Sequence, residues 1–229
     1  MAYRRTDNVV RRLAARRETI LAAGEALAAE GGMAAVQIAP VAERATIAAG
    51  TVYRYFPSKT DLVAALVTAV AARELAALRK AAGAAPGPVS ALAAAITTFA
   101  ARALAQRKLA WAVLAEPIDA EANAARLGYR EALVSEIATR IAAAKANGHL
   151  PDQDPALSAP ALVGALLEGL IGPLAPAGAA DPGKARATVQ ALTLFALRGL
   201  GVVDARARGL VVQTLVPAFD LPAMEPGGS

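Results

Sequence analysis

Residues 41–59, which read VAERATIAAGTVYRYFPSK, constrain the fold of this chain more than any other stretch. Their first part places apolar residues on one side of about two helical turns. A second short helix is predicted at residues 48–56, because Pro57 stops it. Within this helix, Val52 and Phe56 are four residues apart and point in the same direction, toward a core that also takes Ile47. The stretch therefore predicts two short helices joined by a tight turn.

The composition favours helices over the whole chain. Of the 229 residues, 56% are hydrophobic and only 4% are aromatic, which is the bias of packed helices. We expect an all-α fold, with an N-terminal three-helix helix-turn-helix domain at residues 1–60 and a long helix leading into a C-terminal helical bundle at residues 61–222. Residues 1–12 are expected to be a flexible basic arm, which either contacts DNA or is a solvated tail, and residues 223–229 a tail.

Glycines, prolines and apolar periodicity set the bounds of the predicted helices. A first helix runs from Leu13 to the pair Gly31-Gly32, and a second begins at about Ala39. Beyond residue 59, the predicted helices span residues 60–80, 89–106, 108–115, 120–146, 156–174, 185–199 and 205–218.

Several classes of function are disfavoured. The chain has no cysteine and a single histidine, His149, so thiol catalysis, disulfides and histidine-cluster metal sites have no basis. We expect no enzyme activity, no cofactor and no metal site. Charges, glycines or prolines interrupt the long apolar windows, and the basic N-terminus lacks the apolar core of a signal peptide. We therefore expect no membrane span and a cytoplasmic protein.

The excess of positive charge lies near the N-terminus. Residues 1–60 contain nine Lys and Arg against five Asp and Glu, whereas residues 61–229 contain fifteen against fourteen. A basic segment attached to a nearly neutral remainder is typical of a module that binds a polyanion.

The second short helix leaves a distinctive open face once Val52 and Phe56 point inward. Small residues around Gly50 would let its backbone approach the floor of a DNA major groove closely. Thr51 can hydrogen-bond a base edge or a phosphate, and tyrosine hydroxyls and Arg54 can reach phosphates. The pattern indicates a helix that enters double-stranded DNA.

The next helix opens with Ser58, Lys59, Thr60 and Asp61. Ser58 stands at the N-cap and Asp61 at the position of its partner acid. Lys59 then lies at the positive end of a helix, where a bound phosphate would relieve the repulsion. The alternative is an exposed lysine without a role.

These residues together resemble a known family. The first helix, VAERA at residues 41–45, GTVYRYF at residues 50–56, and Ser58-Lys59 with Leu62 closely resemble the tetracycline-repressor (TetR) family of bacterial transcription regulators, over about residues 16–66. The resemblance implies that Thr51, Tyr53 and Tyr55 contact DNA, that Lys59 holds a phosphate, and that Val52 and Phe56 are core. The full set of expected DNA-binding residues is Gln37, Arg44, Ala48, Ala49, Gly50, Thr51, Tyr53, Arg54, Tyr55 and Lys59.

Three positions depart from the common pattern of the family. Thr46 stands where glycine is usual in the turn, Ala48 where a polar cap often begins the second short helix, and Gln37 where threonine often caps the first. These departures leave the operator sequence open.

The predicted helices at residues 156–174 and 185–199 are apolar on nearly all sides, with Glu168 and Arg198 as isolated charges. Such helices are buried on all sides, either in a core or against another chain. Family members dimerise through late helices, which favours a homodimer interface over ordinary core. The expected interface residues are Gly164, Ala165, Gly169, Gly172, Leu194 and Leu197.

Scarce large and acidic residues suggest a ligand site in the C-terminal bundle. Aromatic side chains can frame an apolar cavity, and a semi-buried carboxylate can orient a polar group in it. The alternative is that the aromatic residues fill the core and the carboxylates are solvated. The expected ligand-binding residues are Phe99, Trp111, Glu116, Tyr129 and Glu168.

The resemblance and these patterns predict a homodimeric repressor that binds a near-palindromic operator. A small, largely apolar effector in the C-terminal bundle would release it from DNA. A second interpretation is a ligand-independent DNA-binding dimer controlled by a protein partner. A third is an all-helical enzyme, for which the sequence offers no convergent set of acid–base residues.

Overall fold

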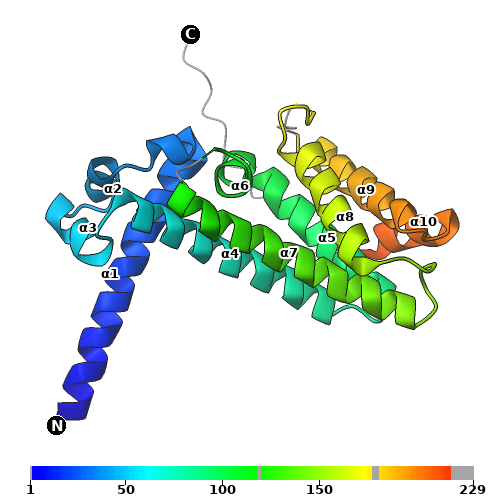
Figure 1. Cartoon of the computed structure of the whole chain (residues 1–229), viewed down its shortest axis with the longest axis horizontal. Coiled ribbons are helices and arrows are strands. Elements are labelled where there is room, and N and C mark those ends of the chain that lie inside the picture. The colour runs from blue at the N-terminus through cyan, green and yellow to red at the C-terminus, as the bar shows by residue number, and fades with distance from the viewer. Residues whose placement is uncertain (1, 118–119, 177–180, 218–229) are drawn as a thin grey trace. The chain divides into compact units, whose positions relative to one another are not determined.

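The computed structural model describes residues 2–117, 120–176 and 181–217, and this part of the chain is built from helices without strands (Figure 1). The all-α expectation is confirmed. In chain order the helices are α1 (Ala2–Gly31), the 3-10 helix η1 (Met33–Ala35), α2 (Ile38–Arg44), α3 (Ala49–Tyr55), α4 (Lys59–Gly83), α5 (Pro88–Ala105), α6 (Arg107–Leu114), α7 (Ala120–Ala146), α8 (Pro155–Leu170), α9 (Pro182–Gly199) and α10 (Asp204–Gln213).

The chain forms two compact units. Unit 1 combines Met1–Ala72 with Trp111–Arg130, and unit 2 combines Arg73–Ala110 with Glu131–Ser229. The sequence predicted a boundary after residue 60, whereas residues 61–72 and 111–130 belong to the N-terminal unit. Periodicity could not show this, because contacts between segments far apart in the sequence define the units. The expected tail at residues 223–229 lies outside the described residues.

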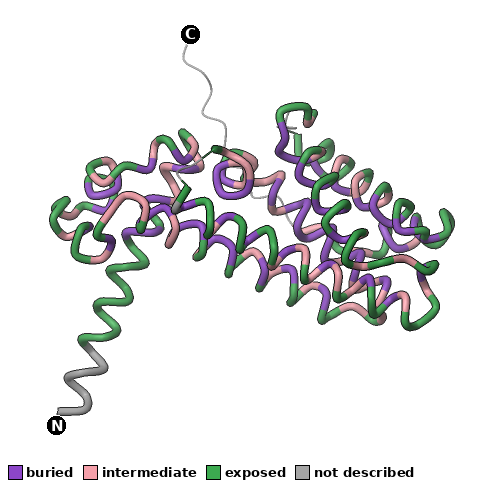
Figure 2. The backbone as a smooth tube through the Cα atoms, viewed as in Figure 1, coloured by how far each residue is buried: buried purple, intermediate pink, exposed green. Residues whose placement is uncertain are grey.

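The first helix is longer than the sequence predicted. It begins at Ala2 rather than at Leu13, because no proline or glycine precedes Gly24 and the arginines and alanines are good helix formers. The side chains at positions 9–19 are exposed, and burial begins at Ile20 (Figure 2). Backbone hydrogen bonds and helix propensity, rather than packing, therefore account for the N-terminal half of α1.

The core of unit 1 joins α1, α2, α3 and the start of α4. The guanidinium of Arg17 on α1 lies 5.3 Å from the centroid of the Phe56 ring, a cation–π contact that covers the end of α3. The buried residues of this core include Ile20, Ala28, Val36, Val41, Val52, Phe56, Leu62 and Leu66.

In unit 2, α5 is the central helix and packs mainly against α9, with further contacts to α8 and α10. The buried hydroxyls of Thr97 on α5 and Thr193 on α9 lie 3.1 Å apart and form a hydrogen bond between the two helices. By length and composition alone α5 could cross a membrane, but most of it is buried inside the unit. Its apolar character is therefore explained by its place in the core.

Two partly buried carboxylates in unit 2 are held by arginines. Glu74 on α4 pairs with Arg102 on α5, with one contact of 2.8 Å. Glu136 on α7 pairs with Arg79 of α4 at 2.5 Å and with Arg140 at 2.7 Å. These pairs connect α4 to both α5 and α7.

Candidate nucleic-acid interface

The turn between α2 and α3 has the hydrogen bonds of a Schellman motif. The N–H of Ile47 donates to the carbonyl of Ala42 at 2.9 Å, and the N–H of Thr46 donates to that of Glu43 at 3.0 Å. Thr46 has φ 54° and is the one non-glycine residue of the described part with positive φ. This is the position where the family pattern has glycine, and the backbone shows why: the left-handed region disfavours a β-branched residue.

The bounds of α3 agree closely with the sequence prediction. It begins at Ala49 after Ala48, whose extended backbone makes it the N-cap without a side-chain hydrogen bond. It ends at Tyr55, because Phe56 is extended ahead of Pro57. Val52 and Phe56 are buried as predicted, while Ile47 is only half-buried.

The face of α3 opposite this core is open. Tyr53 is 52% exposed, and a Cβ added at Gly50 would meet no atom within 4 Å. In the free protein, the expected close-approach surface is therefore unobstructed. Its exposed members are Ala48, Ala49, Gly50, Tyr53 and Arg54, and Thr51 and Tyr55 at its edge are half-buried.

The predicted capping residues of α4 form a capping box. The N–H of Asp61 donates to Ser58 Oγ at 3.0 Å, and the Ser58 N–H donates to the Asp61 carboxylate at 3.1 Å. Between them, Lys59 begins the helix and is half-buried. The start of α4, and with it the backbone of Lys59, is therefore fixed by local sequence.

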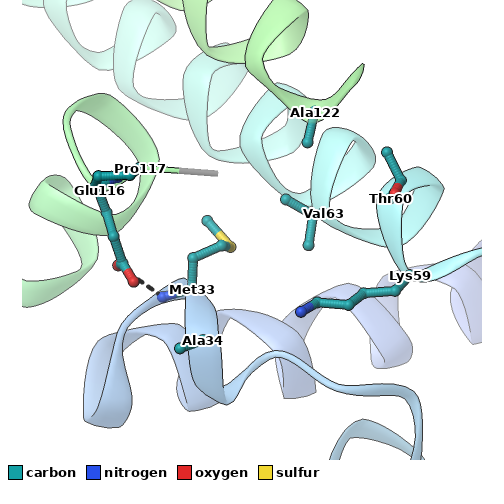
Figure 3. Close-up of a pocket in the computed structure, with 8 residues that line it drawn as sticks. All are labelled: Met33, Ala34, Lys59, Thr60, Val63, Glu116, Pro117 and Ala122. Atoms are coloured by element: carbon teal, nitrogen blue, oxygen red, sulfur yellow. Dashed lines mark hydrogen bonds between the residues drawn. The ribbon is translucent and has the colours of Figure 1, made fainter. Parts of the chain in front are cut away.

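The Lys59 side chain lies along a pocket in unit 1 and extends toward Met33 (Figure 3). The pocket encloses about 210 Å³. On its other side the Glu116 carboxylate accepts a hydrogen bond from the Met33 N–H at 2.8 Å. The remaining lining residues are Ala34, Thr60, Val63, Pro117 and Ala122.

Two other expected DNA-binding residues are engaged within the protein. Arg44 on α2 makes two hydrogen bonds to the carboxylate of Glu30 on α1. The hydrogen bond to Glu30 raises the pKa of Arg44, and that from Arg44 lowers the pKa of Glu30. Gln37 is the N-cap of α2 but donates its side-chain N–H to the carbonyl of Ala34 at 3.0 Å. Both side chains are exposed or partly exposed and can exchange these partners.

The five expected ligand-binding residues are divided between the two units. Phe99 and Glu168 belong to unit 2, whereas Trp111, Glu116 and Tyr129 belong to unit 1. Phe99 and Tyr129 are buried. Glu168 is exposed and its carboxylate accepts from the Leu174 N–H at 3.4 Å.

A cavity in unit 2 was not anticipated from the sequence. It encloses about 320 Å³ and lies where the end of α4, the start of α5 and the end of α10 meet. No sequence signal marks it, because its walls are mostly small or common residues brought together from distant parts of the chain. The lining residues are Ala81, Ala84, Ala85, Pro86, Ser90, Ala94, Thr98, Leu210, Gln213, Thr214 and Leu215.

The expected interface residues on α8 and α9 divide between surface and core. Gly164 and Ala165 are exposed on α8, whereas Leu197 is fully buried. Gly169 allows Leu192 of α9 to pack closely, since an added Cβ would lie 3.1 Å from its side chain. Gly172 is buried and Leu194 half-buried. The neighbouring exposed apolar residues include Leu157 on α8 and Phe195 on α9.

Sequence comparison finds known relatives for the segment that carries α2 and α3. Residues 20–66 match the family model described as bacterial regulatory proteins, tetR family. The HTH-type transcriptional repressor KstR of Rhodococcus jostii (strain RHA1) is 59% identical over 56 residues, which are 24% of this chain and 25% of the relative. The matched segment thus spans about a quarter of that repressor.

Comparison of structures extends the likeness in fold to the rest of the chain. RolR in complex with resorcinol has a TM-score of 0.64 at 20% identity, covering 91% of this chain and 99% of that one. The transcriptional regulator FadR of Bacillus subtilis in complex with stearoyl-CoA has a TM-score of 0.66 at 17% identity, covering 81% and 98%. Together with the family match, the shared fold confirms the resemblance seen in the sequence: residues 20–66 form the N-terminal domain of the tetR family of bacterial regulatory proteins.

Proposed function

We propose that this chain is a transcriptional repressor that binds double-stranded DNA through α3. The main support is the open face of α3, where Gly50 is unobstructed and Tyr53 and Arg54 are exposed. The buried side chains of Val52 and Phe56 hold this helix against the core. A helix with this surface can lie deep in a major groove while its flanking hydroxyls and guanidinium reach phosphates. The family match and the repressor relative support this function over that of an enzyme.

DNA binding requires three side chains to change partners. Arg44 leaves Glu30 for a phosphate, Gln37 leaves the carbonyl of Ala34, and Lys59 moves out of its pocket. A phosphate at the start of α4 would be favoured by the helix dipole and by the positive charge of Lys59. The free structure thus holds these groups near the surface on which DNA would lie.

The proposed active species is a homodimer. Alone, α3 presents few side chains that can discriminate bases, so specificity would come from two copies at a fixed spacing of about 34 Å on a near-palindromic site. The faces of α8 and α9 that are not buried within unit 2 are rich in small and apolar residues, which suits an interface between two copies. The exposed small and apolar residues of these helices include Leu157, Ala161, Gly164, Ala165, Ala191 and Phe195.

A small, largely apolar effector would control the repressor. The cavity in unit 2 has an apolar wall, and Ser90, Thr98 and Gln213 offer polar groups that could orient a ligand. RolR and the Bacillus subtilis FadR have been solved with resorcinol and stearoyl-CoA, which supports an effector without identifying it. A coupling of about 1–3 kcal/mol between effector and DNA would change affinity roughly 5- to 150-fold.

Selection of bound duplexes from random DNA tests the proposal. We expect a near-palindromic site bound by two chains, and Tyr53→Ala should bind it more weakly without loss of dimerisation. Lys59→Ala should also lower the slope of log affinity against log salt by about one, because one phosphate contact is lost. Recovery of no preferred sequence, or equal affinity of both variants and parent across salt, would contradict the proposal.

A panel of apolar compounds distinguishes effector control from control by a protein partner. Binding of a compound should raise the thermal stability of the chain and release it from the selected DNA. If no compound in a broad panel does either, the partner-controlled dimer becomes the better interpretation.

A further inference from the structure

Glu116 acts on the turn between α1 and α2 from a distant part of the chain. Its carboxylate accepts the N–H of Met33, the first residue of η1, at 2.8 Å across 83 positions of sequence (Figure 3). The residue in front of η1 is Gly32, which has no side chain to cap it. The unpaired N–H at the start of a helix prefers an anionic oxygen. Glu116 supplies this oxygen from outside the helix-turn-helix module.

The residue before Met33 is a glycine in a conformation that leaves room for the Glu116 carboxylate. Its φ of 73° and ψ of −172° fall in a region that only glycine adopts readily. A Cβ added there would also lie 2.7 Å from Glu116 Oε2, which is closer than real contacts allow. A side chain at residue 32 would therefore force the Glu116 carboxylate to move away from the Met33 N–H.

The end of α6 sets the position of Glu116. The N–H groups of Ala115 and Glu116 both donate to the carbonyl of Trp111, at 2.8 and 2.9 Å, and so close the last turn. Pro117 follows and prevents the helix from continuing. The chain reaches this turn from unit 2 through α6, whose residues 107–110 belong to that unit. Glu116 thus lies shortly after Trp111, where the chain re-enters unit 1.

A buried cation in the same unit favours an acidic residue at this place. Arg126 on α7 is only 9% exposed, and its Nε has no hydrogen-bond partner among the described residues. Burial and the charge of Arg130 lower the pKa of Arg126, while the charge of Glu116 opposes that shift. Glu116 therefore caps η1 and partly compensates Arg126.

We propose that Glu116 is a positioning residue for DNA binding: by capping η1 through the Met33 N–H, it fixes the turn that orients α2 and α3. The inference rests on the proposed DNA-binding function. It gives Glu116 a further role beside the ligand contact expected from the sequence: a link between the end of α6 and the helix-turn-helix module.

Two measurements on the full chain test the inference. Without DNA, Glu116→Ala should speed hydrogen exchange of the Met33 amide at least tenfold, while the α3 amides exchange as in the parent. With DNA selected from random duplexes, the same variant should bind about tenfold more weakly, because fewer molecules hold the module in its binding conformation. The salt slope should not change, since Glu116 contacts no phosphate.

Three further variants test whether the effect of Glu116→Ala on DNA affinity comes from the loss of the η1 cap. Glu116→Gln keeps an oxygen acceptor and should restore part of the DNA affinity, and Gly32→Ala should weaken binding as Glu116→Ala does, by removing the room for the carboxylate. Glu18→Ala, at an exposed position of α1, should change neither measurement. If Glu116→Ala does not fold, Glu116→Gln and Gly32→Ala provide the same two readouts.

The outcomes distinguish this inference from the function on which it rests. An unchanged Met33 exchange rate would overturn the capping role, and faster exchange with unchanged DNA affinity would overturn the positioning role. A changed salt slope would show instead that the loss of Glu116 alters the phosphate contacts of other residues, such as Lys59 in the same pocket. Failure of the parent to select DNA would count against the proposed function, while the exchange experiment would still decide the capping role.

Discussion

Both carboxylate oxygens of Glu30 on α1 accept hydrogen bonds from the guanidinium of Arg44 on α2, at 2.5 and 2.8 Å. The pair ties two helices of the helix-turn-helix module together and occupies an arginine expected to meet DNA. DNA phosphates therefore have to compete with a carboxylate for the same guanidinium.

Glu30→Gln is expected to raise DNA affinity several-fold at low salt. The substitution removes the carboxylate that competes with a phosphate for Arg44, so affinity should rise while the salt slope stays that of the parent, in whose complex Arg44 already contacts a phosphate. Titration of the selected DNA at several salt concentrations checks this. Arg44→Ala should lower the slope by about one, and identical slopes for both variants would show that Arg44 contacts no phosphate.

Thr46→Gly is expected to stabilise the protein by about 1 kcal/mol, because it relieves a β-branched residue at φ 54°. Thermal or denaturant unfolding of unit 1 measures the gain. Gly148→Ala is the matched control in unit 2: with φ 68° and no atom near the added Cβ, it should cost about 1 kcal/mol through the backbone alone. A neutral Thr46→Gly would mean that the turn relaxes without a glycine.

Gly50→Ala is expected to separate stability from DNA binding. The added methyl group meets nothing in the free protein, so helix propensity should raise stability by up to about 1 kcal/mol. On DNA the same methyl group would hold α3 away from the groove and lower affinity. Gly128→Ala, on an exposed position of α7 with equal room, should affect stability only. Unchanged DNA affinity of Gly50→Ala would exclude close approach at this residue.

Much of the DNA-binding module could be predicted because its determinants are local. The burial of Val52 and Phe56 follows from their spacing, and the capping box of Ser58 and Asp61 from their offset of three. Even the positive φ of Thr46 was marked by a departure from the family pattern. Such features depend on residues within one or two helical turns of each other.

The long-range relationships could not be predicted in the same way. Glu116 stood out as a scarce residue, but nothing in its neighbourhood pointed to the Met33 N–H 83 positions away. Likewise, residues 156–174 and 185–199 are apolar on nearly all sides in sequence, and only the packing shows that Leu197 faces the core while Phe195 is exposed. Periodicity tells which helices have an apolar face but not which partner covers it.

Acid is expected to weaken unit 2 below about pH 4.5. Burial would raise the pKa of Glu74, but Arg102 and Arg73 outweigh it and leave the pKa lowered from 4.5. Burial would likewise raise the pKa of Glu136, but Arg140 and Arg79 outweigh it and leave that pKa lowered. Both carboxyl groups have a lower pKa in the folded state than in the unfolded chain. The stability that these ion pairs contribute is therefore complete at a pH above the ordinary carboxyl pKa, and it is lost as the pH falls through the lowered pKa values.

Urea unfolding between pH 7 and pH 3 measures this loss, and Glu74→Gln supplies the control. That variant should be less stable than the parent at pH 7 by about 1–3 kcal/mol, the usual contribution of hydrogen bonds to a charged group. The difference should shrink in acid, where the parent carboxyl is protonated. A constant difference from pH 7 to pH 3 would show that the loss comes from packing instead.

Phe195→Glu is expected to break the proposed dimer without unfolding the protomer. Phe195 is 59% exposed on α9, so its replacement leaves no cavity in unit 2, but a carboxylate at the centre of an apolar interface would face its own copy unpaired. Sedimentation equilibrium should show dimer dissociation increased at least about 100-fold, with unchanged helicity and much weaker binding to a two-half-site duplex. Val212→Glu, at an exposed position of α10, should remain as dimeric as the parent. A Phe195→Glu variant that stays dimeric would place the interface away from this face of α9.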